Sequence, residues 1–165
     1  MGRPLRLNVE NGIYHVYARG NDRGSIFDDD ADRLAYLRLL GKVSSAMEWR
    51  CLAFCLMTNH VHLLLETPVG NLSRGMQRLQ SSYTKAFNGR RQRTGHLFGS
   101  RFGSTLVESD EQLAAVAKYI DDNPIEAGIC DRASDWPWSS AYAQAVGPSP
   151  PWLDSARLRA LLKGV

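Results

Sequence analysis

The chain has 165 residues, of which 44% are hydrophobic, and this is enough to bury the core of one domain without disulfides. The first residues lack the apolar central region of a signal peptide, and the longest apolar run, residues 51–57, is too short to span a bilayer. Of three cysteines, Cys51 and Cys55 lie inside that run, which indicates reduced core residues. The sequence gives no sign of export or of a membrane anchor and favours a cytoplasmic protein.

The formal net charge of +3 is small, but the charges are unevenly distributed. Residues 67–107, the basic segment, contain seven Lys or Arg and no Asp or Glu, whereas the rest of the chain is more acidic than basic. Because phosphate neutralisation drives sequence-independent binding to nucleic acids, such a segment is typical of a surface that binds a polyanion. The alternative is a solvated basic face. The basic residues are Arg74, Arg78, Lys85, Arg90, Arg91, Arg93 and Arg101.

Hydrophobic periodicity, capping residues and turn residues predict the elements in chain order. They are a strand at 13–18, a helix that starts at 28–30 and reaches Met47, strands at 51–57 and 60–66 joined by a short turn, a helix that starts at Asn71, a strand at 104–108 and a helix that starts at Ser109. No repeat or domain boundary appears. This order predicts an α+β sandwich in which an antiparallel sheet carries helices on one face.

The helix from Asn71 has an apolar back and a basic front. Its apolar residues recur within about 80° of one another at roughly 100° per residue. These are Leu72, Met76, Leu79, Tyr83 and Phe87, and the residues on the opposite side are Arg74, Arg78 and Lys85.

The last predicted helix begins with Ser109-Asp-Glu-Gln112, which fits a capping box. We expect Pro124 to end it, because proline disfavours helical geometry in the residue before it. Near that end, Tyr119 and Asn123 are four residues apart and so share a face on the flank of the apolar stripe. Taken singly, the tyrosine could be an amphipathic edge residue and the asparagine a helix cap.

The strand at 60–66 places His60 and His62 on one face, because side chains alternate along a strand. Two imidazoles at this spacing can converge on one divalent metal ion. A pair of histidines alone is a weak motif, and two exposed or hydrogen-bonded histidines are the alternative.

Two stretches carry these residues: Met57-Thr-Asn-His-Val-His-Leu-Leu-Leu65 and Tyr119-Ile-Asp-Asp-Asn-Pro-Ile-Glu-Ala-Gly128. Together they resemble the single-tyrosine HUH transposases, and in particular the REP-associated tyrosine transposases. Three shorter stretches agree, namely Tyr14-His-Val with Arg19-Gly-Asn21, Gly95-His-Leu-Phe-Gly-Ser-Arg101 and Trp136-Pro-Trp-Ser-Ser140. The resemblance covers about residues 10–145.

The resemblance implies one HUH domain over residues 1–165, ferredoxin-like, with about four antiparallel strands, flanking helices and a C-terminal extension from about residue 130. It implies that Tyr119 is the nucleophile and that Asn123 is the third metal ligand beside His60 and His62. A hard cation such as Mg²⁺ or Mn²⁺ would polarise the scissile phosphate. Attack by the tyrosine would leave a 5′-phosphotyrosine and a free 3′-hydroxyl.

The implied substrate is single-stranded DNA with a palindromic hairpin and a short flanking tetranucleotide guide. The basic segment would contact phosphates, and His96, Phe98 and Phe102 are candidates to stack on unpaired bases. The resemblance favours a monomer associated with the nucleoid, and no protein partner is indicated. Two alternatives are a hairpin-binding protein without nuclease activity and a metal-dependent hydrolase of a small substrate, of which the basic segment disfavours the second.

Overall fold

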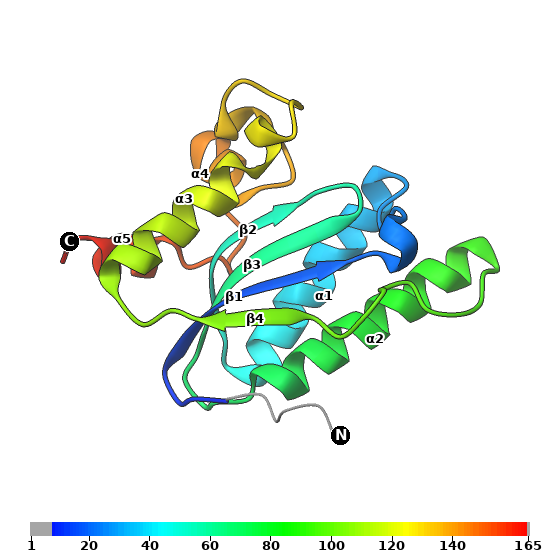
Figure 1. The fold of residues 1–165 in the computed structure, drawn as a ribbon, viewed down its shortest axis with the longest axis horizontal. Helices are drawn as coiled ribbons and strands as arrows, with labels where there is room; N and C mark the ends of the chain where they lie inside the picture. The colour runs from blue at the N-terminus through cyan, green and yellow to red at the C-terminus, as the bar shows by residue number, and fades with distance from the viewer. Residues whose placement is uncertain (1–7, 165) are drawn as a thin grey trace.

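The computed structural model describes residues 8–164, and a four-stranded antiparallel sheet lies at its centre (Figure 1). The strands are β1 (Gly12–Arg19), β2 (Arg50–Leu56), β3 (His60–Thr67) and β4 (Gly103–Leu106). Their order is β2-β3-β1-β4, so β3 and β1 are the central strands. Every strand overlaps the one predicted from periodicity, and the α+β class with about four antiparallel strands and flanking helices is confirmed.

Five α-helices lie within the described residues. They are α1 (Asp30–Met47), α2 (Leu72–Arg91), α3 (Asp110–Glu126), α4 (Ser140–Val146) and α5 (Ser155–Leu162), with single 3-10 turns at Asn21–Arg23 and Ala133–Asp135. The predicted starts are confirmed for α1, where Asp29 forms a capping box with Asp32, and for α3, where Ser109 accepts from the Gln112 amide. Across residues 8–164, no helix combines the length and the apolar character that crossing a membrane requires.

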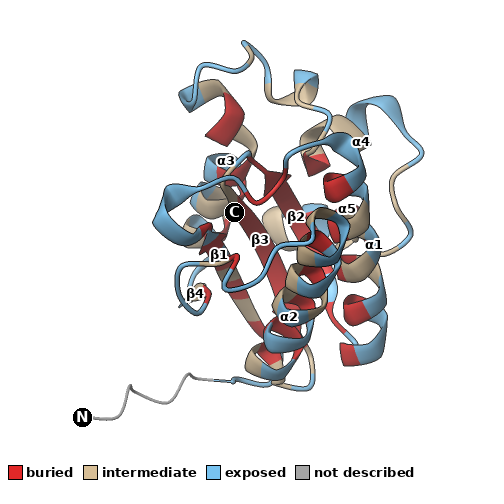
Figure 2. Cartoon of the chain, turned by 90° about the vertical axis from the view of Figure 1, so that its right-hand side faces the viewer, coloured by how far each residue is buried: buried red, intermediate tan, exposed pale blue. Residues whose placement is uncertain are grey.

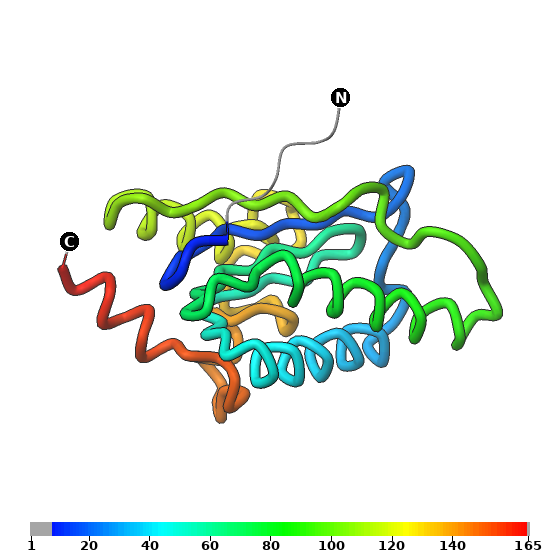
Figure 3. The backbone as a smooth tube through the Cα atoms, turned by 90° about the horizontal axis from the view of Figure 1, so that it is seen from below, coloured from blue at the N-terminus to red at the C-terminus, as the bar shows by residue number. Residues whose placement is uncertain are grey.

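Helices pack on both faces of the sheet, not on one face as predicted (Figures 1 and 3). On one face, α1 and α2 bury Val61, Leu63 and Leu65 of β3 together with the predicted apolar stripe of α2. On the other face, α3 and α5 bury Leu64. Strands β2 and β3 are accordingly buried along most of their length, as Figure 2 shows. The alternation in β3 does not predict this second core, because on this face of the strand Leu64 lies between the polar residues His62 and Glu66.

The expected end of α3 at Pro124 is also wrong, since the helix continues to Glu126. Proline removes only its own amide donor from a helix, so a proline close to the end costs one hydrogen bond. The next amides still find carbonyls, and the Ala127 amide donates to the carbonyl of Asn123 (3.1 Å).

The segment after α3 covers the outer edge of β2. The Leu56 amide donates to the carbonyl of Trp138 (2.8 Å), and the Asp154 amide donates to the carbonyl of Cys51 (2.8 Å). Between them, the Ser140 hydroxyl bonds both the amide and the carbonyl of Phe54. A sheet edge whose backbone groups are paired in this way is closed to another strand. Cys51 and Cys55 are buried and free, as predicted.

Candidate active site

His60 and His62 lie on the face of β3 against which α3 packs. The neighbouring strand β1 places Arg19 opposite His60 and Tyr17 opposite His62. From α3, Asn123 reaches both imidazoles: its Oδ1 is 3.1 Å from His60 Nε2, and its Nδ2 is 3.3 Å from His62 Nε2. The three side chains expected as metal ligands are therefore in contact.

Asn59, in the turn before β3, fixes which nitrogen of His60 carries the hydrogen. The Asn59 Nδ2 group donates to the carbonyl of Arg23 (3.1 Å), so the amide oxygen faces His60 Nδ1 at 2.7 Å. Because an amide oxygen only accepts, the hydrogen lies on Nδ1, and Nε2 of the neutral ring presents a lone pair. That lone pair faces the oxygen of Asn123.

His15 of β1 is a member of the site that the sequence did not single out. Its Nε2 lies 3.0 Å from His62 Nδ1, and the two rings stack with centroids 5.2 Å apart. This contact orients His62 in the way that an outer hydrogen-bond partner orients a metal-binding histidine. The alternation of side chains along β1 could have indicated this role. Tyr14 and Val16 are buried in the core on one face of β1, so His15 lies on the other face, which is the face that carries His60 and His62.

The imidazoles at the site are held neutral. Burial lowers the pKa of His62 to about 3, and the neighbouring His15, His60 and Arg19 act in the same direction. Burial also lowers the pKa of His15 and of His60. Neutral imidazole is the form that binds metal ions, so at neutral pH the three rings are in the protonation state that a metal ion would require.

Tyr119 lies one turn before Asn123 on α3, and its side chain is 43% exposed. Its ring meets His62 edge-on with centroids 5.3 Å apart and His15 with centroids 5.7 Å apart. A tyrosine that touches the histidine cluster and reaches solvent can meet a phosphate bound there.

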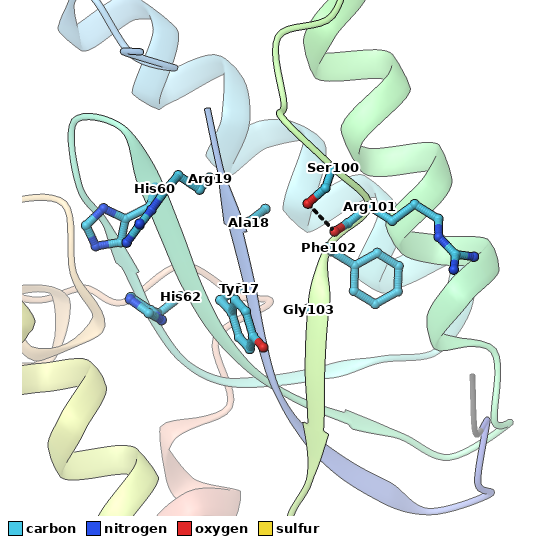
Figure 4. A pocket seen from close by; sticks show the side chains of 9 residues that line it. All are labelled: Tyr17, Ala18, Arg19, His60, His62, Ser100, Arg101, Phe102 and Gly103. Atoms are coloured by element: carbon cyan, nitrogen blue, oxygen red, sulfur yellow. Dashed lines mark hydrogen bonds between the residues drawn. The ribbon is translucent and has the colours of Figure 1, made fainter. Parts of the chain in front are cut away.

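Two other tyrosines are rivals for the role of nucleophile. Tyr83 is only 1% exposed, its hydroxyl donates to the carbonyl of Ile26, and burial raises its pKa, which fits the predicted inward orientation. Tyr17 is exposed beside the site, and nothing in its sequence context marks it as a candidate nucleophile. Its ring lies over Gly103, where a Cβ would come within 2.1 Å of it, and Figure 4 shows its hydroxyl directed away from His60 and His62.

A pocket of about 610 Å³ opens beside the histidines (Figure 4). Its walls include Tyr17, Arg19, His60, His62, Arg101 and Gly103. The absence of a side chain at Gly103 lets the Tyr17 ring lie over this strand, because a Cβ there would displace the ring. Arg19 is the cation that lines the pocket beside the histidine pair, whereas the guanidinium of Arg101 is directed toward α2 (Figure 4).

The donor set fits a divalent metal ion held by two imidazole nitrogens and one amide oxygen. Residues 8–164 contain no cluster of three His, Cys, Asp or Glu side chains that could hold a metal, so the fit depends on Asn123 as a ligand. The lone pairs of His60 Nε2 and Asn123 Oδ1 face each other at 3.1 Å, an arrangement that a cation between them would stabilise.

The basic residues proposed as nucleic-acid ligands fall into two groups. Arg74, Arg78 and Lys85 are exposed on α2 as predicted, and Arg101 lines the pocket. By contrast, Arg90 and Arg91 are engaged in ion pairs with acidic residues at the start of α1, and Arg93 bonds Asn88 and the carbonyl of His96. The acidic partners are Asp28, Asp29 and Asp32.

The three aromatic candidates for base stacking differ in exposure. His96 is exposed and Phe98 is half-buried. Phe102 is 5% exposed and belongs to the core, so its ring is not an open stacking platform.

Comparison with known protein sequences gives two matches. Residues 8–123 match the sequence model of the family described as "Transposase IS200 like". A candidate REP-associated tyrosine transposase of Haemophilus influenzae is 31% identical over 101 residues, which are 54% of this chain and 57% of that protein. The matched region therefore spans a little over half the length of that relative. These findings confirm the resemblance seen in the motifs.

Two solved structures match this chain, and the first of them is similar in fold. The structure of a REP-associated tyrosine transposase bound to a REP hairpin has a TM-score of 0.75 and 18% identity, and the match covers 90% of this chain and 89% of that one. A candidate transposase from Deinococcus radiodurans has a TM-score of 0.49 and 20% identity over 74% of this chain and 95% of its own. The family match extends over most of the chain and includes His60, His62, Tyr119 and Asn123. The chain belongs to the IS200-like transposase family.

Proposed function

We propose that this protein is a metal-dependent endonuclease and strand transferase that cuts single-stranded DNA beside a hairpin through Tyr119. The observation that carries the proposal is the convergence of His60, His62 and the Asn123 amide beneath the Tyr119 ring, next to an open pocket that holds Arg19. If His60 and His62 had only a structural role, neither an open pocket nor an exposed tyrosine would be expected beside them.

In the proposed reaction, the Tyr119 oxygen attacks the phosphorus of the scissile phosphodiester. A bond forms between that oxygen and phosphorus, the bond from phosphorus to the 3′ oxygen breaks, and the 3′ oxygen takes up a proton as the phenol loses one. The products are a 5′-phosphotyrosine and a free 3′-hydroxyl. Attack of another 3′-hydroxyl on the phosphotyrosine reverses these changes and joins two strands.

His60, His62 and Asn123 would hold the metal ion, for which Mg²⁺ and Mn²⁺ are the candidates. When bound, it would act as a Lewis acid on the phosphate oxygens. Arg19 would contact phosphate from the wall of the pocket, and Arg101 would contact phosphate where the strand passes toward α2. Tyr17 would restrict the path of the strand over Gly103.

A hairpin is the proposed feature of the DNA, because the neighbour with TM-score 0.75 was solved with a REP hairpin. The exposed stripe of Arg74, Arg78 and Lys85 on α2 would contact its phosphates. We further propose that the protein acts as a monomer at the nucleoid. The segment after α3 covers the outer edge of β2, and this removes one route to a continuous sheet between two copies.

The test is incubation of the purified protein with labelled hairpin DNA in Mg²⁺ or Mn²⁺, followed by denaturing electrophoresis. We expect a labelled band of protein-bound DNA that survives denaturation and depends on the metal ion. Binding without such a band would indicate a hairpin-binding protein without nuclease activity. Absence of both binding and covalent product would refute the proposal.

A further inference from the structure

A second hollow, of about 350 Å³, lies between α2 and the residues that precede β4. Its walls are Ser73, Gln77 and Gln80 of α2 together with Arg101 and Phe102. Two of these residues, Arg101 and Phe102, also line the pocket beside the histidines. Figure 4 shows both side chains directed toward α2 and away from His60 and His62, so the hollow lies behind the wall of the active-site pocket.

The α2 side of this hollow is a stripe of uncharged polar residues. Ser73, Gln77, Gln80 and Thr84 follow one another at helical spacing and so share one face of α2. At 100° per residue, this stripe lies between the buried apolar stripe and the exposed basic stripe of Arg74, Arg78 and Lys85. A nucleic-acid strand whose phosphates contact the basic stripe would thus direct its bases at the polar one.

Two polar atoms of the hollow lack hydrogen-bond partners. Ser73 Oγ and Gln80 Nε2 are buried, and neither has a partner within residues 8–164. A buried donor or acceptor without a partner destabilises a protein, so such atoms are rare and call for an explanation. The side chains that carry these two atoms, Ser73 and Gln80, line one hollow.

We propose that this hollow binds one unpaired nucleobase of the DNA strand that enters the active site, with Gln77 and Gln80 bonding its edge. This inference rests on the proposed function, because it takes DNA as the substrate. Side-chain amides offer a donor and an acceptor side by side, which matches the donor and acceptor pattern of base edges. The Phe102 ring supplies an apolar wall, and Arg101 stands between the base and the scissile phosphate. The volume is at the lower end for ligand pockets and suits one base, not a duplex.

A third hollow, of about 780 Å³, continues the same path. It shares Gln77, Gln80 and Arg101 with the base site and runs along α2 to the residues before Arg101. The three hollows therefore meet at Arg101. One strand could pass from the scissile phosphate over Arg101 and along α2, with a single base turned into the 350 Å³ hollow.

The test combines a variant of the protein with a scan of the DNA. The probe is a hairpin oligonucleotide that the protein selects from a pool with randomised unpaired flanks, and each flanking nucleotide is made abasic in turn. Affinity is measured without divalent metal ions for wild type, for Gln80→Met, which keeps the length but removes both hydrogen-bonding groups, and for Gln144→Met on α4 as the matched control. Melting temperature is recorded for each protein.

In wild type and in Gln144→Met, we expect one abasic position to weaken binding by about tenfold or more. In Gln80→Met, that position should have no further effect, while the melting temperature should stay equal or rise because an unpartnered buried donor is removed. The same abasic profile in Gln80→Met and in wild type would overturn the base site and leave the proposed function intact. Failure of the wild type to bind any hairpin would overturn both.

Discussion

The two ends of β3 carry polar side chains on one face and use them differently. His60 and His62 lie at the start of the strand, and Glu66 lies near its end. The Glu66 carboxylate accepts two hydrogen bonds from Arg157 of α5, at 2.9 and 3.1 Å, and a third from Arg50 at 3.3 Å. Burial alone would raise the pKa of Glu66, but the hydrogen bonds from the two arginines outweigh it and hold that pKa below its usual value.

At the histidine end, by contrast, the polar atoms meet other neutral groups and an open pocket. His60 and His62 contact the Asn123 amide, and no carboxylate bonds either ring within residues 8–164. A buried carboxylate that is paired with two arginines and accepts three hydrogen bonds from them is a structural contact. Neutral donor atoms that face one another beside a pocket are available to a ligand. The alternation of side chains along β3 predicts polar residues on this face at both ends of the strand. The hydrogen-bond partners of those residues distinguish the functional end from the structural end.

The largest effect is expected from Tyr119→Phe, which removes one oxygen beside the histidine end. Covalent adduct with hairpin DNA should fall at least about a thousandfold, because the proposed nucleophile is lost, while folding and hairpin binding persist. Adduct is measured by denaturing electrophoresis and its position by mass spectrometry. Tyr17→Phe and Tyr83→Phe are the controls and should stay within about tenfold of wild type. A phosphodiester found on Tyr17 or Tyr83 would show that the assignment of Tyr119 is wrong.

His60→Ala and His62→Ala should each abolish nicking and leave hairpin binding largely intact. The proposed metal serves the chemistry, whereas the basic stripe of α2 provides most of the affinity. Nicking is followed by electrophoresis and binding by fluorescence anisotropy on the same preparations. A wild-type nicking rate in either variant would refute the proposed metal site. It would also indicate that the polar residues at both ends of β3 have structural roles only.

The opposite end should respond to substitution in stability and not in chemistry. Glu66→Gln should lower the free energy of unfolding by about 2 kcal/mol at neutral pH, with the nicking rate unchanged. Because the folded-state pKa lies below the unfolded one, the contribution is present above the ordinary glutamate pKa and is lost as pH falls through the lowered value. Denaturant unfolding at several pH values should show the two proteins converging in acid. A difference that persists in acid would mean that packing, not the ion pairs, stabilises this end.

Much of the fold was predictable because its signals are local. The apolar stripe of α2 is buried as its spacing predicts, and the strands and helix starts follow from alternation and capping residues. The second core was missed because Leu64 shares its face with His60, His62 and Glu66, so periodicity marks that face as polar. Only the packing of α3 and α5 shows that it is covered.

For the site, the sequence brought forward four residues that the structure places together, namely His60, His62, Tyr119 and Asn123. Asn59 and His15 could not be assigned, since their roles depend on which ring nitrogen each imidazole turns toward its neighbour. The ion pairs of Arg90 and Arg91 with Asp32 could not be predicted from the sequence either. They arise from the contact of α2 with the start of α1, far away in sequence.

A smaller effect is expected from Asn59, which acts on the histidine end through His60. Asn59→Ala should weaken Mn²⁺ binding about 10- to 100-fold, because His60 is no longer held with the hydrogen on Nδ1. Asn59→Asp keeps an acceptor oxygen and should retain affinity near that of wild type. Isothermal titration with Mn²⁺ measures both variants. Equal affinity in wild type and Asn59→Ala would show that the turn does not set the orientation of His60.

The smallest effect is expected from the basic residues. As at the two ends of β3, some of these side chains are paired within the protein and others are exposed to solvent. Arg90 and Arg91 hydrogen-bond Asp32, and the hydrogen bond from Arg90 is the main cause that lowers the pKa of Asp29 to about 2. Their charges are offset within the protein. Those of Arg74, Arg78 and Lys85 are exposed on α2 and free to neutralise phosphates.

Replacing Arg74, Arg78 and Lys85 by alanine should therefore flatten the log-log salt dependence of hairpin binding by about one unit or less per lost contact. Arg90→Ala with Arg91→Ala should leave that slope nearly unchanged and instead lower the melting temperature, since the acidic residues at the start of α1 lose their partners. Anisotropy titrations over a range of salt concentrations separate the two outcomes. If the slope changed only in the Arg90 and Arg91 variant, the DNA would lie across the junction of α1 and α2, and the exposed stripe would be no more than a solvated face.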